Sequence, residues 1–133
     1  ELPNGGFTAV NAQPWLPLSD AHLRLAVDHQ SKDNASVLNI SRTLIRFRQN
    51  LSAFASQSLT LLDGTETRLE FVRGSGSDAV YCVFNLSPDV DTFATPVSGL
   101  SSSKDACAVH GFEYSEGQIS LPAWGWALMP CSA

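Results

Sequence analysis

The side chains of this chain that could do chemistry are scattered rather than grouped. His22, His29 and His110 lie far apart in the sequence, with no HExxH or other metal-ligand spacing. Serine is abundant, but no serine stands in a G-x-S-x-G turn of the kind that exposes a nucleophile. Each histidine is therefore expected at the surface or in a hydrogen-bonded loop. We predict no metal site, no cofactor and no nucleophilic triad in this chain.

Paired carboxylates are the second kind of chemistry to consider. Cleavage of a glycosidic bond needs two of them, one to protonate the leaving oxygen and one to attack or to activate water. Asp89 with Asp91, and Asp20 with Asp28, are the candidate pairs. Both pairs stand in turn-like or irregular sequence, where solvated carboxylates are the ordinary case. We therefore assign no catalytic residue to this chain.

Composition limits the partners of the chain. Its 133 residues carry a net charge of −5 and only eight Lys and Arg, so a nucleic-acid partner is not expected. No apolar run approaches the roughly 20 residues that cross a bilayer, and the first residues lack the basic and apolar regions of a signal peptide. We expect no membrane association and a cytoplasmic location, with a periplasmic or secreted one left open. Because the chain begins at Glu1 without Met, it is expected to be trimmed or a piece.

The three cysteines favour no metal site and no disulfide framework. Cys82, Cys107 and Cys131 are widely spaced, without a CxxC pair. We expect buried, reduced thiols, above all for Cys82, which lies in an apolar run. A bridge between Cys107 and Cys131 is left as the alternative.

One helix is predicted, after an irregular start. Residues 1–33 contain three prolines, and only the alternation around Leu23, Leu25 and Val27 suggests extended structure. Polar residues that can accept hydrogen bonds from a first helical turn come next. From Ser36 to Gln49 apolar residues then recur about every 3.6 residues, which predicts a helix. The candidate caps are Asp33, Asn34 and Ser36. The apolar stripe of this helix is formed by Val37, Leu38, Ile40, Leu44, Ile45 and Phe47, and the basic residues off it are Arg42, Arg46 and Arg48.

After Asn50 the pattern changes to short runs of β-forming residues separated by turns, which is typical of an antiparallel β unit. The run at 79–84 is apolar on both sides and predicts a central strand, whereas Arg68–Arg73 predicts apolar residues inside and charged residues outside. The predicted strands are Ser58–Leu62, Thr67–Arg73, Ala79–Asn85, Thr92–Val97, Ala106–Val109, Gln118–Leu121 and Trp126–Met129.

An ordered series of motifs resembles the C-terminal part of bacterial α-glucosidases and oligo-1,6-glucosidases of the α-amylase superfamily, glycoside hydrolase family 13. Each motif alone is weak, but their order and spacing are fairly specific over residues 1–50, and the β region matches in general plan. The motifs are Asn4-Gly5-Gly6-Phe7-Thr8, Gln13-Pro14-Trp15-Leu16-Pro17-Leu18, Ala26-Val27-Asp28-His29-Gln30, Asp33-Asn34-Ala35-Ser36-Val37-Leu38 and Leu44-Ile45-Arg46-Phe47-Arg48.

The resemblance implies a mainly β chain in two parts. Residues 1–53 would be the last βα loop and the eighth helix of a (β/α)8 barrel that other residues complete. Residues 54–133 would be the antiparallel β-sandwich called domain C. Sites of such barrels are built by βα loops, so Phe7 and Trp15 are implied at the rim of a substrate site.

The activity implied by the resemblance is retaining hydrolysis of α-glucosidic bonds, or glucosyl transfer from them. The implied substrates are α-linked gluco-oligosaccharides or disaccharides. The family's nucleophile, general acid and third carboxylate come from earlier strands, so the isolated chain is expected to be inactive. Its partner would be the remainder of the barrel, which this chain would support.

Two other interpretations remain open at this stage. A stand-alone carbohydrate-binding β-sandwich is suggested by Tyr114, Trp124 and Trp126, aromatic residues near the end of the chain. A structural interaction module is the other, and it predicts that the apolar stripe of the helix is exposed.

Overall fold

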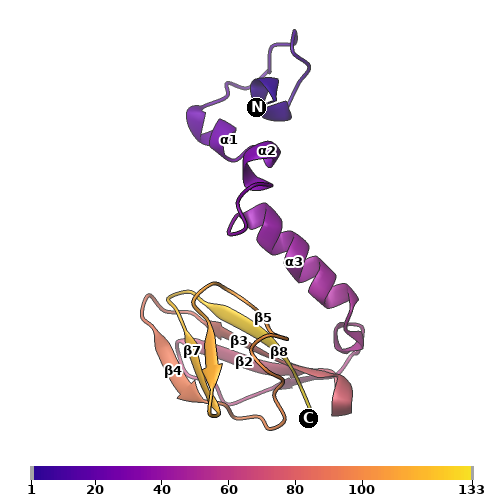
Figure 1. The fold of residues 1–133 in the computed structure, drawn as a ribbon, viewed down its shortest axis with the longest axis vertical. Coiled ribbons are helices and arrows are strands. Elements are labelled where there is room, and N and C mark those ends of the chain that lie inside the picture. Colours follow the sequence, from indigo (N-terminus) through magenta and orange to yellow (C-terminus); the bar gives the residue numbers. More distant parts are fainter. Residues whose placement is uncertain (1, 133) are drawn as a thin grey trace. The chain divides into compact units, whose positions relative to one another are not determined.

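The computed structural model describes residues 2–132, and their contacts divide the chain into two compact units (Figure 1). The first unit comprises residues 1–45 and the second residues 46–133. Helix α3 (Val37–Gln49) contains the boundary between them. The division at residues 53 and 54 that the resemblance implies stays a prediction.

The first unit is made of short helices and irregular chain. A 3-10 turn at Pro3–Gly6 is followed by α1 (Asp20–Arg24) and α2 (Val27–Gln30). Of residues 2–45, Ala26 and Ser36 alone are buried. This unit therefore has almost no hydrophobic core of its own.

The extended structure expected around Leu23, Leu25 and Val27 is wrong, because helices occupy this stretch. Ser19 starts α1 with a reciprocal cap. Its hydroxyl accepts the His22 backbone N–H at 3.4 Å, and His22 Nδ1 accepts the Ser19 N–H at 3.3 Å. The cap satisfies two amide groups that a first helical turn leaves free. Capping thus outweighed the apolar alternation.

The long helix is confirmed almost to the residue. Of the three candidate caps Ser36 is the one used, since its hydroxyl accepts the Asn39 N–H at 3.2 Å. No residue of α3 is buried, and Val37 and Ile45 are 73% and 56% exposed. The other four residues of the apolar stripe, Leu38, Ile40, Leu44 and Phe47, are half-buried within the described chain. No helix among residues 2–132 has the length and apolarity needed to span a bilayer.

The second unit is built on two antiparallel sheets (Figure 1). A five-stranded sheet has the order β1-β2-β3-β8-β5, and a three-stranded sheet has the order β4-β7-β6. The strands are β1 (Leu59–Leu61), β2 (Arg68–Arg73), β3 (Ala79–Asn85), β4 (Asp91–Ala94), β5 (Cys107–Ala108), β6 (Glu113–Ser115), β7 (Gln118–Leu121) and β8 (Trp126–Cys131). The mainly β fold class expected from the sequence is thus confirmed.

The strand predictions hold best in the interior of the sheets. β3 and β7 have the predicted bounds, and β3 pairs with both β2 and β8 as a central strand. β6 was missed, since it is only three residues long and lies at the edge of its sheet. β8 continues beyond the predicted end at Met129 to Cys131, because Pro130 still pairs with Val80 and its carbonyl accepts the Ser101 N–H at 2.9 Å.

The hydrophobic core lies between the two sheets. Tyr81, Val83 and Met129 of the larger sheet are fully buried with Ile119 and Leu121 of the smaller one. Residues that are part-buried, Tyr114 among them, pack against this cluster. The second unit therefore has the core that the first unit lacks.

The in-out alternation predicted for β2 is wrong. Glu70 is buried at 2% exposure, whereas Leu69 is 41% exposed. The buried carboxylate has strong partners, since Arg68 Nε donates to Glu70 Oε1 at 2.6 Å and the Tyr81 hydroxyl donates to Glu70 Oε2. A buried charge is tolerated where it is paired and hydrogen-bonded. Arg68 also reaches Asp91 on β4 at 2.9 Å, which the sequence pattern of β2 does not reveal.

A second buried polar side chain joins two loops of the β unit. Asn85 is 2% exposed, and its Nδ2 donates to the carbonyls of Asp89 at 2.7 Å and Pro122 at 2.9 Å. Its Oδ1 accepts the Ser87 N–H and hydroxyl at 3.0 and 2.8 Å. The Asn85 side chain thus supplies hydrogen bonds that polar groups of the β3–β4 and β7–β8 connections would otherwise make with water.

All three cysteines are free and buried, as predicted. The alternative bridge between Cys107 and Cys131 is not formed. Burial raises the pKa of the Cys82 thiol to about 12, and it also raises the pKa values of Cys107 and Cys131. These thiols are therefore protonated and inert at neutral pH.

Candidate functional site

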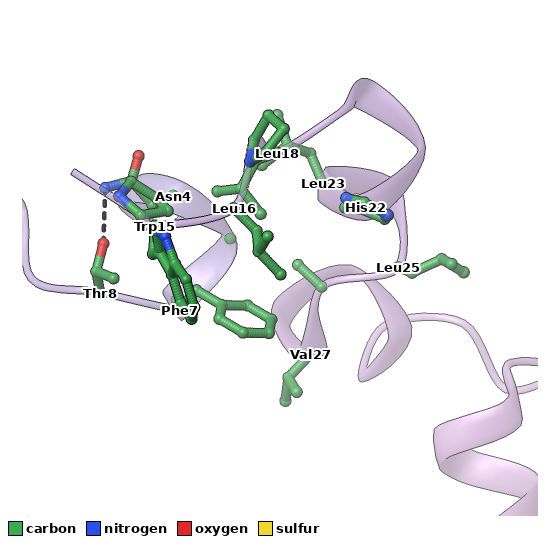
Figure 2. Close-up of a pocket in the computed structure, with 15 residues that line it drawn as sticks. Asn4, Phe7, Thr8, Trp15, Leu16, Leu18, His22, Leu23, Leu25 and Val27 are labelled. Carbon is green, nitrogen blue, oxygen red and sulfur yellow. Dashed lines mark hydrogen bonds between the residues drawn. The ribbon is translucent and has the colours of Figure 1, made fainter.

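A hollow of about 830 Å³ lies within the first unit (Figure 2). Its volume falls in the range of small-molecule sites, which are concave and mostly apolar. The wall contains few polar side chains, those of Asn4, Thr8 and His22. The lining residues are Asn4–Thr8, Pro14–Leu18, His22, Leu23 and Leu25–Val27.

The first wall of the hollow is a loop with an internally bonded backbone. Asn4, Gly5 and Gly6 have φ values of 54°, 62° and 79°, the left-handed region that glycine and asparagine tolerate best. Asn4 Nδ2 donates to Thr8 Oγ1 at 2.9 Å and to the Ala12 carbonyl at 3.1 Å. Figure 2 shows the Asn4–Thr8 bond as a dashed line. The loop is held by its own side chains.

The opposite wall comes from α1 and the start of α2. His22 belongs to it, and its Nδ1 is taken by the Ser19 N–H, so this nitrogen is an acceptor within the helix cap. The sequence prediction of a hydrogen-bonded loop role for His22 is close, since the residue caps a helix. The signal that could have found it is the Ser19-x-x-His22 spacing, which resembles a capping box.

Both predicted rim residues line the hollow. Phe7 is 81% exposed and Trp15 97% exposed, so neither side chain is used to fill a core within the described chain. In Figure 2 the two aromatic side chains lie on the same wall, away from α1. Contact with a substrate stays a prediction for both.

The candidate carboxylates do not share a site, and the contacts of each are of the kind that stabilise a fold. Asp91 is bound to Arg68, and Asp89 lies in the loop that Asn85 organises. Asp28 accepts the backbone N–H groups of Leu2 at 3.2 Å and His29 at 3.1 Å. Desolvation raises the pKa of Asp28, but these bonds outweigh it and hold the pKa below its ordinary value. Among residues 2–132, no group of three His, Cys, Asp or Glu side chains could hold a metal ion.

The three aromatic residues near the end of the chain do not form one surface. Tyr114 packs against the core between the sheets, whereas Trp124 is 64% exposed in a turn with φ of 56°. Trp126 lies on β8, directly opposite Phe84 of β3. The aromatic cluster that suggested a stand-alone carbohydrate-binding sandwich is therefore divided.

Comparison with known proteins gives relatives of one kind. No protein-family model matches the chain. A "Probable alpha-glucosidase" of Rhizobium meliloti (strain 1021) is 36% identical over 126 residues, which are 93% of this chain and 22% of the relative. An oligo-1,6-glucosidase of Saccharomyces cerevisiae (strain ATCC 204508 / S288c) is 28% identical over 101 residues, 72% of this chain and 17% of the relative.

Solved structures agree with these relatives. An alpha-glucosyl transfer enzyme superposes with a TM-score of 0.72 at 28% identity, covering 89% of this chain and 22% of that enzyme. An isomaltulose synthase from Erwinia rhapontici NX5 has a TM-score of 0.76 at 18% identity, over 93% of this chain and 23% of its own, and shows the shared fold alone.

The extent of these matches agrees with the C-terminal segment that the motifs implied. The chain spans about a fifth of the length of the curated relatives it matches. Over that span it is similar to proteins named α-glucosidase and oligo-1,6-glucosidase and to an alpha-glucosyl transfer enzyme of known structure.

Proposed function

We propose that this chain is the C-terminal portion of a retaining α-glucosidase, which hydrolyses α-glucosidic bonds of small oligosaccharides or transfers glucose from them. The observation that carries the proposal is the 36% identity to the Rhizobium meliloti protein over 93% of the chain. The relatives are named α-glucosidase and oligo-1,6-glucosidase, and the activity is inferred here for the polypeptide that contains these 133 residues.

The role proposed for this chain is support and a site rim, not bond cleavage. The first unit has the features of a piece that needs a larger body, since it buries only Ala26 and Ser36 among its described residues. The remainder of a (β/α)8 barrel is the proposed partner, because the apolar stripe of α3, none of which is fully buried in the described chain, suits the outer wall of a barrel. A cytoplasmic location is part of the same proposal.

Phe7 and Trp15 are the proposed rim residues. Their side chains are both exposed and part of the hollow, which is the placement that a contact with an entering sugar requires. Aromatic rings offer a large apolar face at a small entropic cost, and sugar rings present apolar C–H faces to them. This role requires no charged side chain from the chain.

The complete polypeptide tests the proposal. Incubated with maltose or isomaltose, it should release glucose, and proton NMR should show the α-anomer before mutarotation, since a retaining enzyme keeps the configuration. Absence of glucose release, or first appearance of the β-anomer, would contradict the proposal. The isolated 133 residues should release none.

Variants of the rim residues test the site. Phe7→Ala and Trp15→Ala should each raise KM with kcat little changed, because they remove binding common to substrate and transition state. Val10→Ala is the matched control, since Val10 is 71% exposed in the same loop but does not line the hollow. An unchanged KM in both aromatic variants would remove the rim assignment.

A further inference from the structure

We propose that Asn4 and Thr8 are positioning residues that hold Phe7 at the rim of the hollow. The inference rests on the proposed function, because it concerns the same rim. Neither residue belongs to the hydrophobic core, and neither is needed for bond cleavage. The proposal gives both of them a role.

Within the described chain, packing does not place the side chain of Phe7. With 81% of the residue exposed, few neighbours restrict its direction. If the ring must meet a substrate in one orientation, that orientation depends on the backbone of Phe7. A freely moving loop would have to be ordered each time a substrate binds, which costs binding free energy. Within the described chain, the restraint comes from the residues on either side of Phe7.

Both sides of Phe7 are restrained. Before it, the Phe7 N–H donates to the Asn4 carbonyl at 3.1 Å, which closes the turn through the left-handed residues Asn4, Gly5 and Gly6. After it, Thr8 Oγ1 accepts from Asn4 Nδ2 at 2.9 Å and donates to the Ala12 carbonyl at 3.2 Å.

Asn4 suits this position for two separate reasons. Its φ of 54° is costly for most residues but is tolerated by asparagine. Its amide also supplies two donors, used for Thr8 Oγ1 and the Ala12 carbonyl. Glycine would keep the backbone and lose both bonds, so the two contributions can be separated by substitution.

The test is a double-mutant cycle in the complete polypeptide, with steady-state kinetics on isomaltose. Thr8→Val keeps the shape of the side chain and removes the hydroxyl, whereas Thr8→Ser keeps the hydroxyl. We expect Thr8→Val and Asn4→Gly to raise KM by about two- to tenfold, the range set by one aromatic contact, with kcat unchanged. Thr8→Ser should restore the wild-type KM.

The decisive readout is the coupling with Phe7. In a Phe7→Ala background, Thr8→Val should have no further effect on KM, since a positioning residue acts only through the ring it positions. Thr43→Val, an exposed threonine of α3, is the control and should leave KM unchanged.

The possible outcomes separate the two proposals. If the polypeptide cleaves no α-glucoside, the proposed function fails and this inference fails with it. If Phe7→Ala raises KM but Thr8→Val does not, or if the two effects add fully, the proposed function stands and the positioning role is overturned. Circular dichroism of each variant should match the wild type, and a Thr8→Val spectrum that indicates unfolding would also overturn the assignment, because the loop would then be part of the scaffold.

Discussion

The Arg68 guanidinium on β2 donates a hydrogen bond of 2.9 Å to the Asp91 carboxylate on β4, and so links the two sheets of the β unit. The same side chain binds the buried Glu70 and lies 3.8 Å from the centre of the Phe93 ring. Burial lowers the pKa of Arg68, but its bonds to Glu70 and Asp91 outweigh this and hold the pKa above its ordinary value. The inter-sheet core thus contains a charged network that is fully partnered.

Removal of Glu70 should destabilise the β unit strongly. Glu70→Ala leaves Arg68 without its nearest counter-charge and Tyr81 without its acceptor, so the free energy of unfolding should fall by about 3 kcal/mol. Urea denaturation followed by circular dichroism measures this. Glu66→Ala, an exposed carboxylate in the preceding turn, is the control and should stay within about 0.5 kcal/mol of wild type. Equal effects of both variants would contradict the network's role.

The hydroxyl of Tyr81 should make the β unit sensitive to alkaline pH. Burial and the hydrogen bond to Glu70 raise the pKa of Tyr81 above its ordinary value. The stabilisation is therefore complete below about pH 10, where an unfolded tyrosine begins to ionise, and declines as pH rises further. Tyr81→Phe should lose about 1–2 kcal/mol at pH 7, and the difference from wild type should shrink towards pH 11. A constant difference in urea titrations across this range would argue against the ionisation.

Asn85 should matter far more than an exposed asparagine. Asn85→Ala removes four hydrogen bonds of a side chain that is 2% exposed and that links the β3–β4 and β7–β8 connections. We expect a loss of about 2–3 kcal/mol in the free energy of unfolding. Asn34→Ala, at an exposed position of the turn before α3, should change stability little. Thermal unfolding of the two variants side by side checks the prediction, and similar midpoints would refute it.

The three thiols should report global unfolding of the β unit. Because Cys82, Cys107 and Cys131 are buried and their pKa values are raised, Ellman's reagent should react slowly with the native chain. In denaturant all three should react at once. Rapid reaction of any thiol in the native chain would show that its segment opens locally.

Amide exchange should differ between the helix and the central strand. No residue of α3 is buried, whereas six of the seven residues of β3 are. Exchange in the isolated 133 residues should therefore be fast in 37–49 and slow in 79–85, since protection follows buried contacts. Mass spectrometry of peptic fragments measures both segments in one sample. Equal protection would mean that the helix is stable without a wall to pack on.

The sequence determined those features that depend on neighbours along the chain. The period of 3.6 after Ser36 predicted α3, and the apolar run at 79–84 predicted β3 as a central strand, because each element's own pattern reports the surface it must bury. The order of the Asn4–Thr8 and later motifs likewise predicted the relatives.

Only the tertiary structure decided which side chains face the core of the β unit and which partners they find. Glu70 can lie inside and Leu69 outside because Arg68 neutralises the carboxylate and the Tyr81 hydroxyl of the neighbouring strand donates a hydrogen bond to it. Alternation along one strand cannot reveal the Tyr81 hydroxyl or the Asp91 carboxylate, since both come from other strands. The same is true of the hollow, whose walls meet because Ser19 starts a helix where the sequence suggested extended chain.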